Sequence, residues 1–191
     1  MARLYRYKVY IYSIKPLQLV RFRANMHIPK AREERKMTKN TYFEEIERVT
    51  LKFTEDRERR KAEKEEIINT KGWGSEELKE WRARDEEIKF PYDEGTMKAF
   101  RAWYHQEDNG FETETLVFPD FLWDKEVPGF IRALKKAGIN EFIYTCTSTA
   151  LMDNIHDLEE GGFMMTGLAE IKNTSRWTTD EFTRGLRFEA R

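Results

Sequence analysis

The alternation of strand-like and helix-like segments in the second half of the chain constrains the fold most. Helical spacing of apolar residues occurs at 127–134 and 151–158, and each of these segments follows a short segment of strand composition. The predicted strands are Glu112–Phe118, Glu141–Thr145, Phe163–Lys172 and Arg184–Glu189. Their order with the helices is typical of a partly parallel sheet covered by helices. The sequence therefore predicts an α/β (α+β) fold with a mixed sheet.

The sequence pattern of residues 41–108 predicts a charged helical insert. Thr41 with Glu44 three residues later has the capping-box pattern, and the helix continues through residues 54–68, which are almost entirely polar. A polar helix of this kind bridges solvent or is held by ion pairs between residues four apart. Gly72–Ser75 breaks the pattern, a second helix follows, and Asp93 caps a third.

The charge of the chain is unevenly distributed. Residues 1–39 hold eleven basic and two acidic residues, a formal charge of +9, whereas the whole chain is at −1 and residues 40–191 are therefore at −10. We expect strands at 3–14 and 17–22, which form a basic N-terminal strand arm. Such an arm suits nucleic acid or an acidic protein groove, or it lies against the acidic helices of its own chain. We divide the chain into regions 1–40, 41–108 and 109–191, and residues 1–22 could join the last region as one domain.

Composition excludes several classes of protein. Aromatic residues make up 14% of the chain, a load that a disordered chain does not carry. No apolar stretch approaches the length of a membrane span, and the N-terminus lacks the apolar region of a signal peptide. A single cysteine, Cys146, fits a reducing environment. We expect a cytoplasmic protein that contacts no membrane.

Basic residues of the arm are the candidate contacts for an acidic partner. Arg6 and Lys8 share a face with Tyr10 and Tyr12, a combination that suits phosphate contact with base stacking, or the solvated face of an edge strand. The candidate contacts are Arg6, Lys8, Arg21, Arg23, Arg32, Arg35 and Lys36.

Two further features have a binding or a structural interpretation. Ser148 and Thr149 stand where a strand passes into a helix, so they form a candidate anion site or an ordinary helix cap. The aromatic residues of the helical insert could bind a partner, build the core or form a homodimer seam. These aromatic residues are Trp73, Trp81, Phe100, Trp103 and Tyr104.

Signals for catalysis are weak. Pro119-Asp120 and Glu170-Ile171-Lys172 match the two elements of a metal-dependent nuclease, but 49 residues separate them. Cys146 and His156 invite a nucleophile–base interpretation without a third orienting residue. No metal-ligand spacing, phosphate-binding loop or nucleophile elbow occurs. We expect no cofactor and no metal, and the sequence favours a protein that is not an enzyme.

Residues 149–167 resemble the last helix–strand unit of a GNAT acetyltransferase, in which a helix ends in Gly-Phe and the next strand carries a further glycine. The family's acetyl-CoA loop, Gln/Arg-x-x-Gly-x-Gly/Ala, is missing from this sequence. The resemblance therefore implies a shared local topology, or a degenerate acyltransferase as an alternative function.

A second resemblance covers residues 111–191. The segments Lys135–Ile139, Ser148–His156 and Gly161–Phe163 are similar to small proteins encoded on mobile elements of Firmicutes, some of which are anti-CRISPR proteins against type II (Cas9) effectors. The resemblance implies an inhibitor that works by binding. We predict a non-enzymatic protein that engages a Cas9-type effector or its guide RNA through the basic arm and the charged helix. The alternatives are the GNAT-like acyltransferase and the metal-dependent nuclease.

Overall fold

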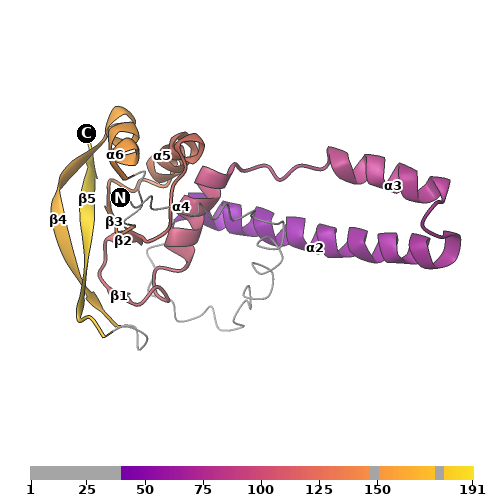
Figure 1. Cartoon of the computed structure of the whole chain (residues 1–191), viewed down its shortest axis with the longest axis horizontal. Coiled ribbons are helices and arrows are strands. Elements are labelled where there is room, and N and C mark those ends of the chain that lie inside the picture. Colours follow the sequence, from indigo (N-terminus) through magenta and orange to yellow (C-terminus); the bar gives the residue numbers. More distant parts are fainter. Residues whose placement is uncertain (1–39, 147–150, 175–178) are drawn as a thin grey trace, which may run out of the picture. The chain divides into compact units, whose positions relative to one another are not determined.

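Strands and helices alternate along the second half of the chain (Figure 1). The structure is a computed structural model, and it describes residues 40–146, 151–174 and 179–191. The α-helices of the described part are α2 (Thr41–Lys71), α3 (Glu76–Glu87), α4 (Glu94–Tyr104), α5 (Val127–Lys136) and α6 (Leu151–Glu160). The strands are β1 (Phe111–Glu112), β2 (Leu116–Phe118), β3 (Glu141–Tyr144), β4 (Phe163–Asn173) and β5 (Phe182–Ala190).

The strands form one mixed sheet in the order β1-β4-β5-β3-β2. Strands β2 and β3 are parallel, with Leu116 opposite Phe142, and the other neighbours are antiparallel. Helix α5 connects the parallel pair, as a crossover between parallel strands requires. The predicted α+β class, with a mixed sheet and covering helices, is confirmed. The predicted N-terminal strand arm lies outside the described residues.

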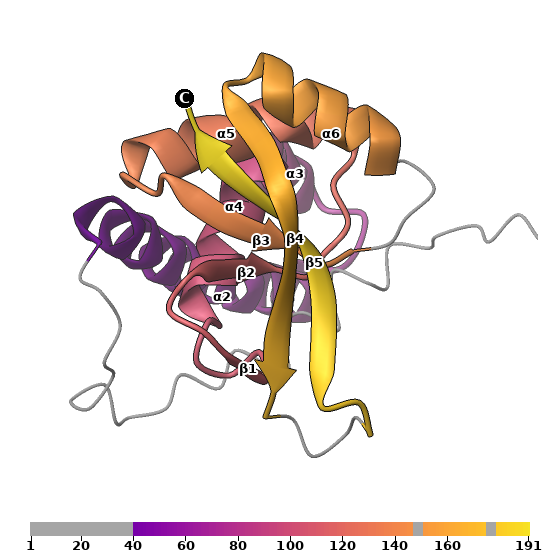
Figure 2. The same cartoon turned by 90° about the vertical axis from the view of Figure 1, so that its left-hand side faces the viewer.

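The sheet is rolled rather than flat. Strands β1 and β2 lie at its opposite edges, yet only residues 113–115 connect them. Strands are spaced about 4.8 Å apart, so the edges of a flat five-stranded sheet would lie about 19 Å apart. The linker spans at most about 15 Å. Strands β4 and β5 therefore curve across the sheet (Figure 2), and inside the curve a small apolar cluster joins Val117, Ile143, Ala169 and Ile171.

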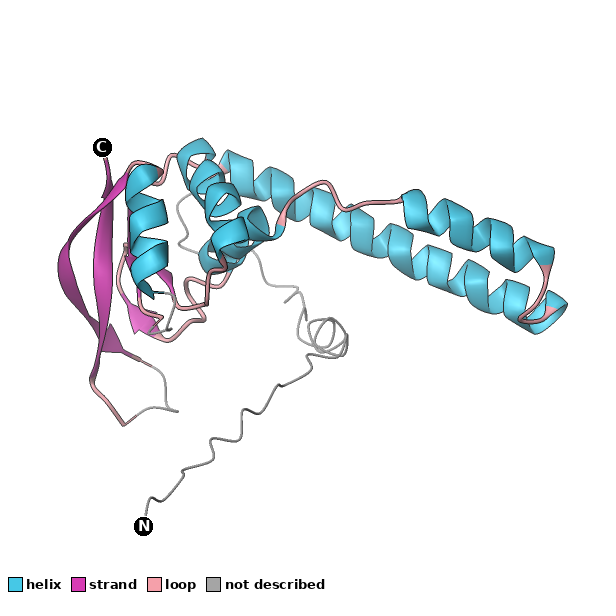
Figure 3. Ribbon diagram, turned by 45° about the horizontal axis from the view of Figure 1, so that its top comes forward, coloured by secondary structure: helices cyan, strands magenta, loops and turns pink. Residues whose placement is uncertain are grey.

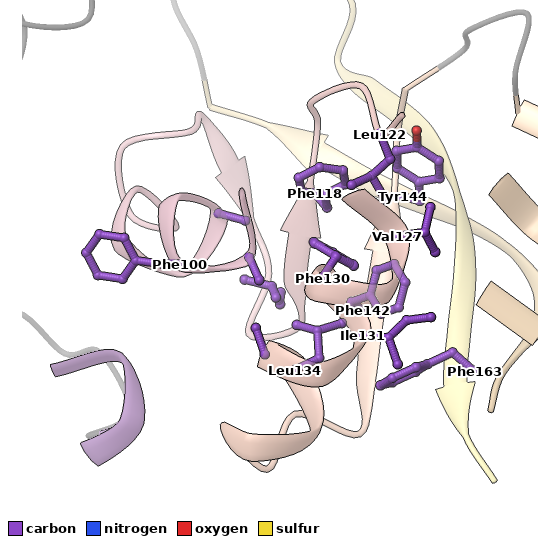
Figure 4. Packing of buried hydrophobic residues seen from close by; sticks show 14 of the residues in the cluster. Phe100, Phe118, Leu122, Val127, Phe130, Ile131, Leu134, Phe142, Tyr144 and Phe163 are labelled. Atoms are coloured by element: carbon purple, nitrogen blue, oxygen red, sulfur yellow. The ribbon is translucent and has the colours of Figure 1, made fainter. Parts of the chain in front are cut away.

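The other face of the sheet carries the main core, which is rich in phenylalanine (Figure 4). Phe142 on β3 stacks on Phe188 of β5 with ring centroids 5.1 Å apart. Phe130 of α5 contacts both Phe118 and Phe142. Full burial of one such side chain contributes about 1.5–3 kcal/mol, so this cluster is the main source of stability. Helix α4 shares the same core through Met97 and Phe100.

Helices α2 and α3 form an antiparallel hairpin (Figure 3). The base of α2 enters the main core, where Phe43 and Ile46 are fully buried. From Phe53 onward, α2 contacts α3 and the residues after it. The antiparallel pairs are Phe53 with Phe90, Arg60 with Asp85, Glu63 with Arg84, Lys64 with Trp81 and Lys71 with Glu77. The predicted charged helix over 54–68 is thus one part of a hairpin.

Three element boundaries differ from the sequence expectation. Asn40, not Thr41, caps α2, because its Oδ1 accepts a hydrogen bond from the amide of Phe43 at 3.1 Å while its Nδ2 donates to the carbonyl of Ala137 at 2.7 Å. The strand predicted over 112–118 is split into β1 and β2, since the chain crosses here from one sheet edge to the other. The Asn109-Gly110 pair is a turn signal that predicts the end of the third helix, but α4 already ends at Tyr104.

Candidate functional site

The basic-arm residues and the anion-site residues predicted from the sequence lie outside the part of the chain that the structure describes. This holds for the arm residues Arg6, Lys8, Arg21, Arg23, Arg32, Arg35 and Lys36, and for Ser148 and Thr149. Their assignment therefore stays a prediction. Within the described residues, the chemically richest region is the carboxyl end of the parallel strands β2 and β3, where open α/β sheets generally bind ligands.

A buried ion pair lies at this end of the sheet. Lys98 of α4 reaches the loop after β2, and its Nζ lies 2.9 Å from Oε2 of Glu126, with both side chains less than one tenth exposed. The same nitrogen donates to the carbonyl of Phe121 and lies 3.9 Å from Asp120. Glu126 also accepts a hydrogen bond from the amide of Trp123 at 3.0 Å. The pair therefore fixes the loop, and the polar atoms of Lys98 are engaged with it.

The same loop has little capacity to cradle a phosphate. The amide of Phe121 donates to Asp120, and the amides of Glu126 and Val127 both donate to the carbonyl of Trp123. Residues 120–127 contain no glycine, and Pro128, which has no amide, stands in the first turn of α5. Phosphate loops depend on free backbone amides at close approach. This loop uses its amides to hold its own shape.

A second polar cluster joins the loop to α6. The buried Asn154 donates from Nδ2 to the carbonyl of Leu122 at 3.1 Å and to the hydroxyl of Tyr144 at 3.2 Å. The backbone carbonyl of Leu122 can only accept a hydrogen bond, so the nitrogen of the Asn154 side-chain amide must face it. Oδ1 of Asn154 is buried with no hydrogen-bond partner in the described part, an arrangement that costs about 1–3 kcal/mol.

Tyr144 is held in its neutral form. Burial raises the pKa of Tyr144 to about 12, and the neighbouring Cys146 adds to the rise, while hydrogen bonds from Asn154 and from the backbone of Leu122 act in the opposite direction. A phenol with this pKa is no general base near neutral pH. The side chain of His156, the predicted partner of Cys146, is exposed on α6 and contacts Glu160 of the same helix at 3.3 Å.

A small cavity of about 140 Å³ lies between α4 and the end of β2. Lys98 and Arg101 of α4, His105 directly after that helix, and Pro119 and Asp120 after β2 are among its lining residues. Pockets for drug-sized ligands and cofactors usually enclose about 300–1,000 Å³. The cavity is therefore too small for a nucleotide-sized cofactor.

The two elements of the nuclease pattern belong to strands that do not pair with each other. Asp120 follows β2, whereas Glu170 and Lys172 lie on β4, and β3 and β5 separate these strands in the sheet. Glu170 pairs with Arg184 at 3.0 Å, and Lys172 pairs with Glu112 at 2.7 Å. No group of three or more metal-ligating side chains occurs among the described residues.

The aromatic residues predicted in the helical insert differ in burial. Trp81 is buried in the seam with α2, Phe100 is buried in the main core, and Trp103 packs on Phe43 at 5.3 Å. Trp73, in the turn between α2 and α3, is 69% exposed. Core formation therefore accounts for the helix aromatics, and Trp73 is the exception.

Some of these residues gave no sequence signal for their role. Lys98 and Asn154 are polar residues within helical patterns, and polar residues at such positions are usually solvated. Trp73 carried a signal of its own, because a tryptophan between two glycines marks a turn, but the pattern did not distinguish a packed ring from an exposed one.

Comparison with known proteins gives one match. A family model with the description "Domain of unknown function (DUF7698)" matches residues 98–190. The match begins inside α4 and ends at the last residue of β5, so it includes the sheet, α5 and α6 and leaves out the hairpin. No curated protein and no solved structure matches the chain. In the described residues, no helix has both the length and the apolarity needed to cross a membrane.

Proposed function

We propose that the chain acts by binding a partner rather than by catalysis. The hairpin of α2 and α3 carries this proposal. Past the first two turns of α2, the hairpin contributes only Leu78 and Trp81 to the buried apolar residues of the described part. The core of the sheet and its helices has little need of such an element. A long element that adds little to the core is best explained by what its surface contacts.

The loop after β2 supports the same interpretation. The amide of Phe121 donates to Asp120, the amide of Trp123 donates to Glu126, and Glu126 pairs with Lys98. These polar groups therefore fix the conformation of the loop. A GNAT-like acyltransferase needs an acyl-CoA phosphate cradle, and a metal-dependent nuclease needs converging carboxylates. Neither arrangement forms at this loop or around Glu170.

The partner that we propose is an RNA-loaded effector of the Cas9 type, contacted through its guide RNA. This part of the proposal depends on the +9 charge of residues 1–39 and on the resemblance of the C-terminal half. Helix α2 carries eight basic and nine acidic residues, and α3 carries three and six, so the hairpin has a formal charge of −4. Cations make phosphate contacts. We therefore assign the RNA contact to the N-terminal segment and not to the charged helix.

Fluorescence titration with guide RNA tests the proposal. The test variant reverses five charges of the N-terminal segment: Arg21→Glu, Arg23→Glu, Arg32→Glu, Arg35→Glu and Lys36→Glu. We expect affinity to fall by about 100-fold or more, because each reversed cation removes a phosphate interaction. The dependence of log K on log salt should also flatten, by about 0.7 for each phosphate that the variant no longer binds.

A matched control separates a local effect from net charge. It reverses five exposed cations elsewhere, namely Arg57, Lys61, Arg82, Lys89 and Lys125, and changes the total charge by the same amount. Binding of the control variant should stay within about threefold of wild type at about 150 mM salt, where the Debye length is about 8 Å. Equal losses of affinity in both variants, or no binding of the wild-type chain to the RNA or to the loaded effector, would refute the proposed RNA contact.

Thermal unfolding tests the enzymatic alternatives. A ligand that binds only the folded state raises the apparent stability, by about 2.7 kcal/mol when its concentration is about 100 times Kd. Acetyl-CoA, Mg²⁺ and Mn²⁺ are added separately, and we expect no change in Tm with any of them. A concentration-dependent rise with acetyl-CoA would favour the acyltransferase, and a rise with either metal ion would favour the nuclease.

A further inference from the structure

Trp73 stands out among the large aromatic side chains that the structure describes. Its exposed fraction of 69% is greater than that of Trp123, at 54%, or Phe182, at 49%. Tryptophan is strongly enriched among the residues that dominate binding energy at interfaces. The position of this ring is therefore the first indication of a contact.

A hydrogen-bonded turn holds Trp73 in place. The amide of Gly72 donates to the carbonyl of Ile68 at 3.0 Å and closes α2, with φ of +88° at Gly72. The amide of Ser75 donates back to the carbonyl of Gly72, and the Ser75 hydroxyl caps α3 by accepting from the amide of Leu78 at 3.3 Å. The turn is thus preorganised, which lowers the entropic cost of binding.

The two helices behind the turn support it. Lys64 extends over the ring of Trp81 at 5.3 Å, and Arg60 donates to Asp85 at 2.8 Å. Leu78 is fully buried between the helices and next to the turn. An anchor residue on a braced helical hairpin is presented in a fixed position, as an anchor requires.

The surroundings of Trp73 are acidic. Helix α3 has a net charge of −3, and its spacing places Glu76, Glu80 and Glu87 on the side away from α2. The cations nearest the turn are both paired with glutamates of α3, Lys79 with Glu76 at 2.7 Å and Lys71 with Glu77 at 3.7 Å, so the net charge there stays negative. A base of RNA could stack on the exposed ring, but the acidic flank would repel its phosphates. Charge complementarity therefore favours a protein with basic residues around an apolar pocket.

We propose that the turn of the α2–α3 hairpin is a docking tip, in which Trp73 fills an apolar pocket of a protein partner and the glutamates of α3 face the basic rim of that pocket. The inference rests on the proposed function and extends it, since it adds a contact with the protein component of the effector to the RNA contact of the N-terminal segment.

Titration against two separate probes tests the docking tip. The probes are the purified Cas9-type effector protein without guide RNA, and the guide RNA alone. For Trp73→Ala we expect affinity for the protein to fall by about 30-fold or more, the size typical of an interface hot spot, and affinity for the RNA to change by less than about threefold. Trp73→Phe should recover most of the affinity for the protein. Glu76→Lys with Glu80→Lys should slow association with the protein.

Trp123→Ala is the matched control, because it removes an exposed tryptophan from the loop after β2; its binding should match wild type. Unchanged Tm and far-UV circular dichroism show that Trp73→Ala still folds. Unchanged binding of Trp73→Ala to the protein overturns the docking tip, as does a loss confined to the RNA. Wild-type binding to the RNA but not to the protein overturns the tip and leaves the proposed function intact. Binding to neither probe overturns both.

Discussion

The helix-covered sheet and the α2–α3 hairpin are stabilised by different physical means. The sheet and its helices bury a continuous cluster of phenylalanines, including Phe118, Phe130, Phe142 and Phe188. Beyond the base of α2, the hairpin is held by charged side chains across its seam, with Leu78 and Trp81 as its buried apolar residues. The family match includes the first region and omits the hairpin. The difference indicates that the first region maintains the fold, whereas the hairpin beyond its base adds little to the core, which is the basis of the binding role that we propose for it.

Removing a core ring should have the largest effect on stability. Phe142 is fully buried and contacts Phe130, Phe163 and Phe188. Phe142→Ala should lower the free energy of unfolding by about 3–5 kcal/mol, because it removes buried apolar surface and leaves a cavity. Urea denaturation measures the change. Trp73→Ala in the hairpin turn should change stability by less than about 0.5 kcal/mol. Similar changes in the two variants would contradict the division between the regions.

Breaking the buried ion pair should have the next largest effect. Lys98→Met leaves the carboxylate of Glu126 buried without its cation, at a cost of about 3 kcal/mol. Adding Glu126→Gln removes the stranded charge and keeps an acceptor for the amide of Trp123. The double variant should therefore recover at least half of that stability in urea denaturation. A double variant less stable than Lys98→Met would show that the pair is not the cause.

Two glycines, one from each region, allow a matched comparison of packing. A Cβ at Gly95 of α4 would overlap the carbonyl oxygen of Glu126 and lie 2.7 Å from the amide nitrogen of Phe130, whereas a Cβ at Gly74 of the hairpin turn has nothing within 4 Å. Gly95→Ala must separate α4 from α5 and should cost about 1–3 kcal/mol. Gly74→Ala should be neutral or slightly stabilising. The shift in Tm measures both, and equal shifts would contradict the close approach of α4 and α5.

Local patterns predicted many elements of both regions. The apolar spacing of Val127, Phe130 and Leu134 identifies α5, and Asp93 is recognisable as the cap of α4. The rolled sheet was not predictable in this way, because the order of strands in a sheet depends on contacts between distant segments. For the same reason the sequence predicts one strand over 112–118, where the structure has two.

The candidate site was less predictable than the fold. The Lys98–Glu126 pair joins residues 28 positions apart, and each alone has the sequence environment of a surface residue. The assignment of the seven arm residues and of Ser148 with Thr149 as contacts depends on charge and turn patterns, and it stays a prediction. The sequence marks Trp73 by its residue type, but its exposure depends on how α3 packs against α2.

A carboxylate at the junction of the two regions should give a smaller, pH-dependent effect. Asp93 caps α4 by accepting from the amide of Thr96 at 2.8 Å and pairs with Arg132 of α5 at 2.7 Å. Desolvation alone would raise the pKa of Asp93, but the hydrogen bonds from Thr96 and Arg132 outweigh it, so the pKa lies below its usual value. The ionised form is therefore the one that stabilises the fold.

Asp93→Asn keeps a capping oxygen and removes the charge, so it should cost about 1 kcal/mol at neutral pH. Because the folded-state pKa is lowered, this stabilisation is complete above the ordinary aspartate pKa of about 3.9 and disappears as the pH falls through the folded-state value. Urea denaturation between about pH 7 and about pH 2.5 should show the two proteins converging at the acid end. A difference that persists at the acid end would exclude the carboxylate as its source.

The smallest effect should come from an exposed ion pair of the hairpin. Arg84 lies 3.0 Å from Glu63, and both side chains are about half exposed or more. Exposed pairs contribute about 0–1 kcal/mol and are screened by salt, so Arg84→Gln should leave global unfolding unchanged. Arg60, with a side chain only 17% exposed, pairs with Asp85 in the same seam, and Arg60→Gln should increase amide hydrogen exchange across α3 more than Arg84→Gln does. Exchange in α5 should not change in either variant, because local opening of the hairpin does not require the phenylalanine core to open. Faster exchange in α5 would mean that the two regions unfold together. The hairpin would then be part of the cooperative fold, and its proposed role in binding would lose its main argument.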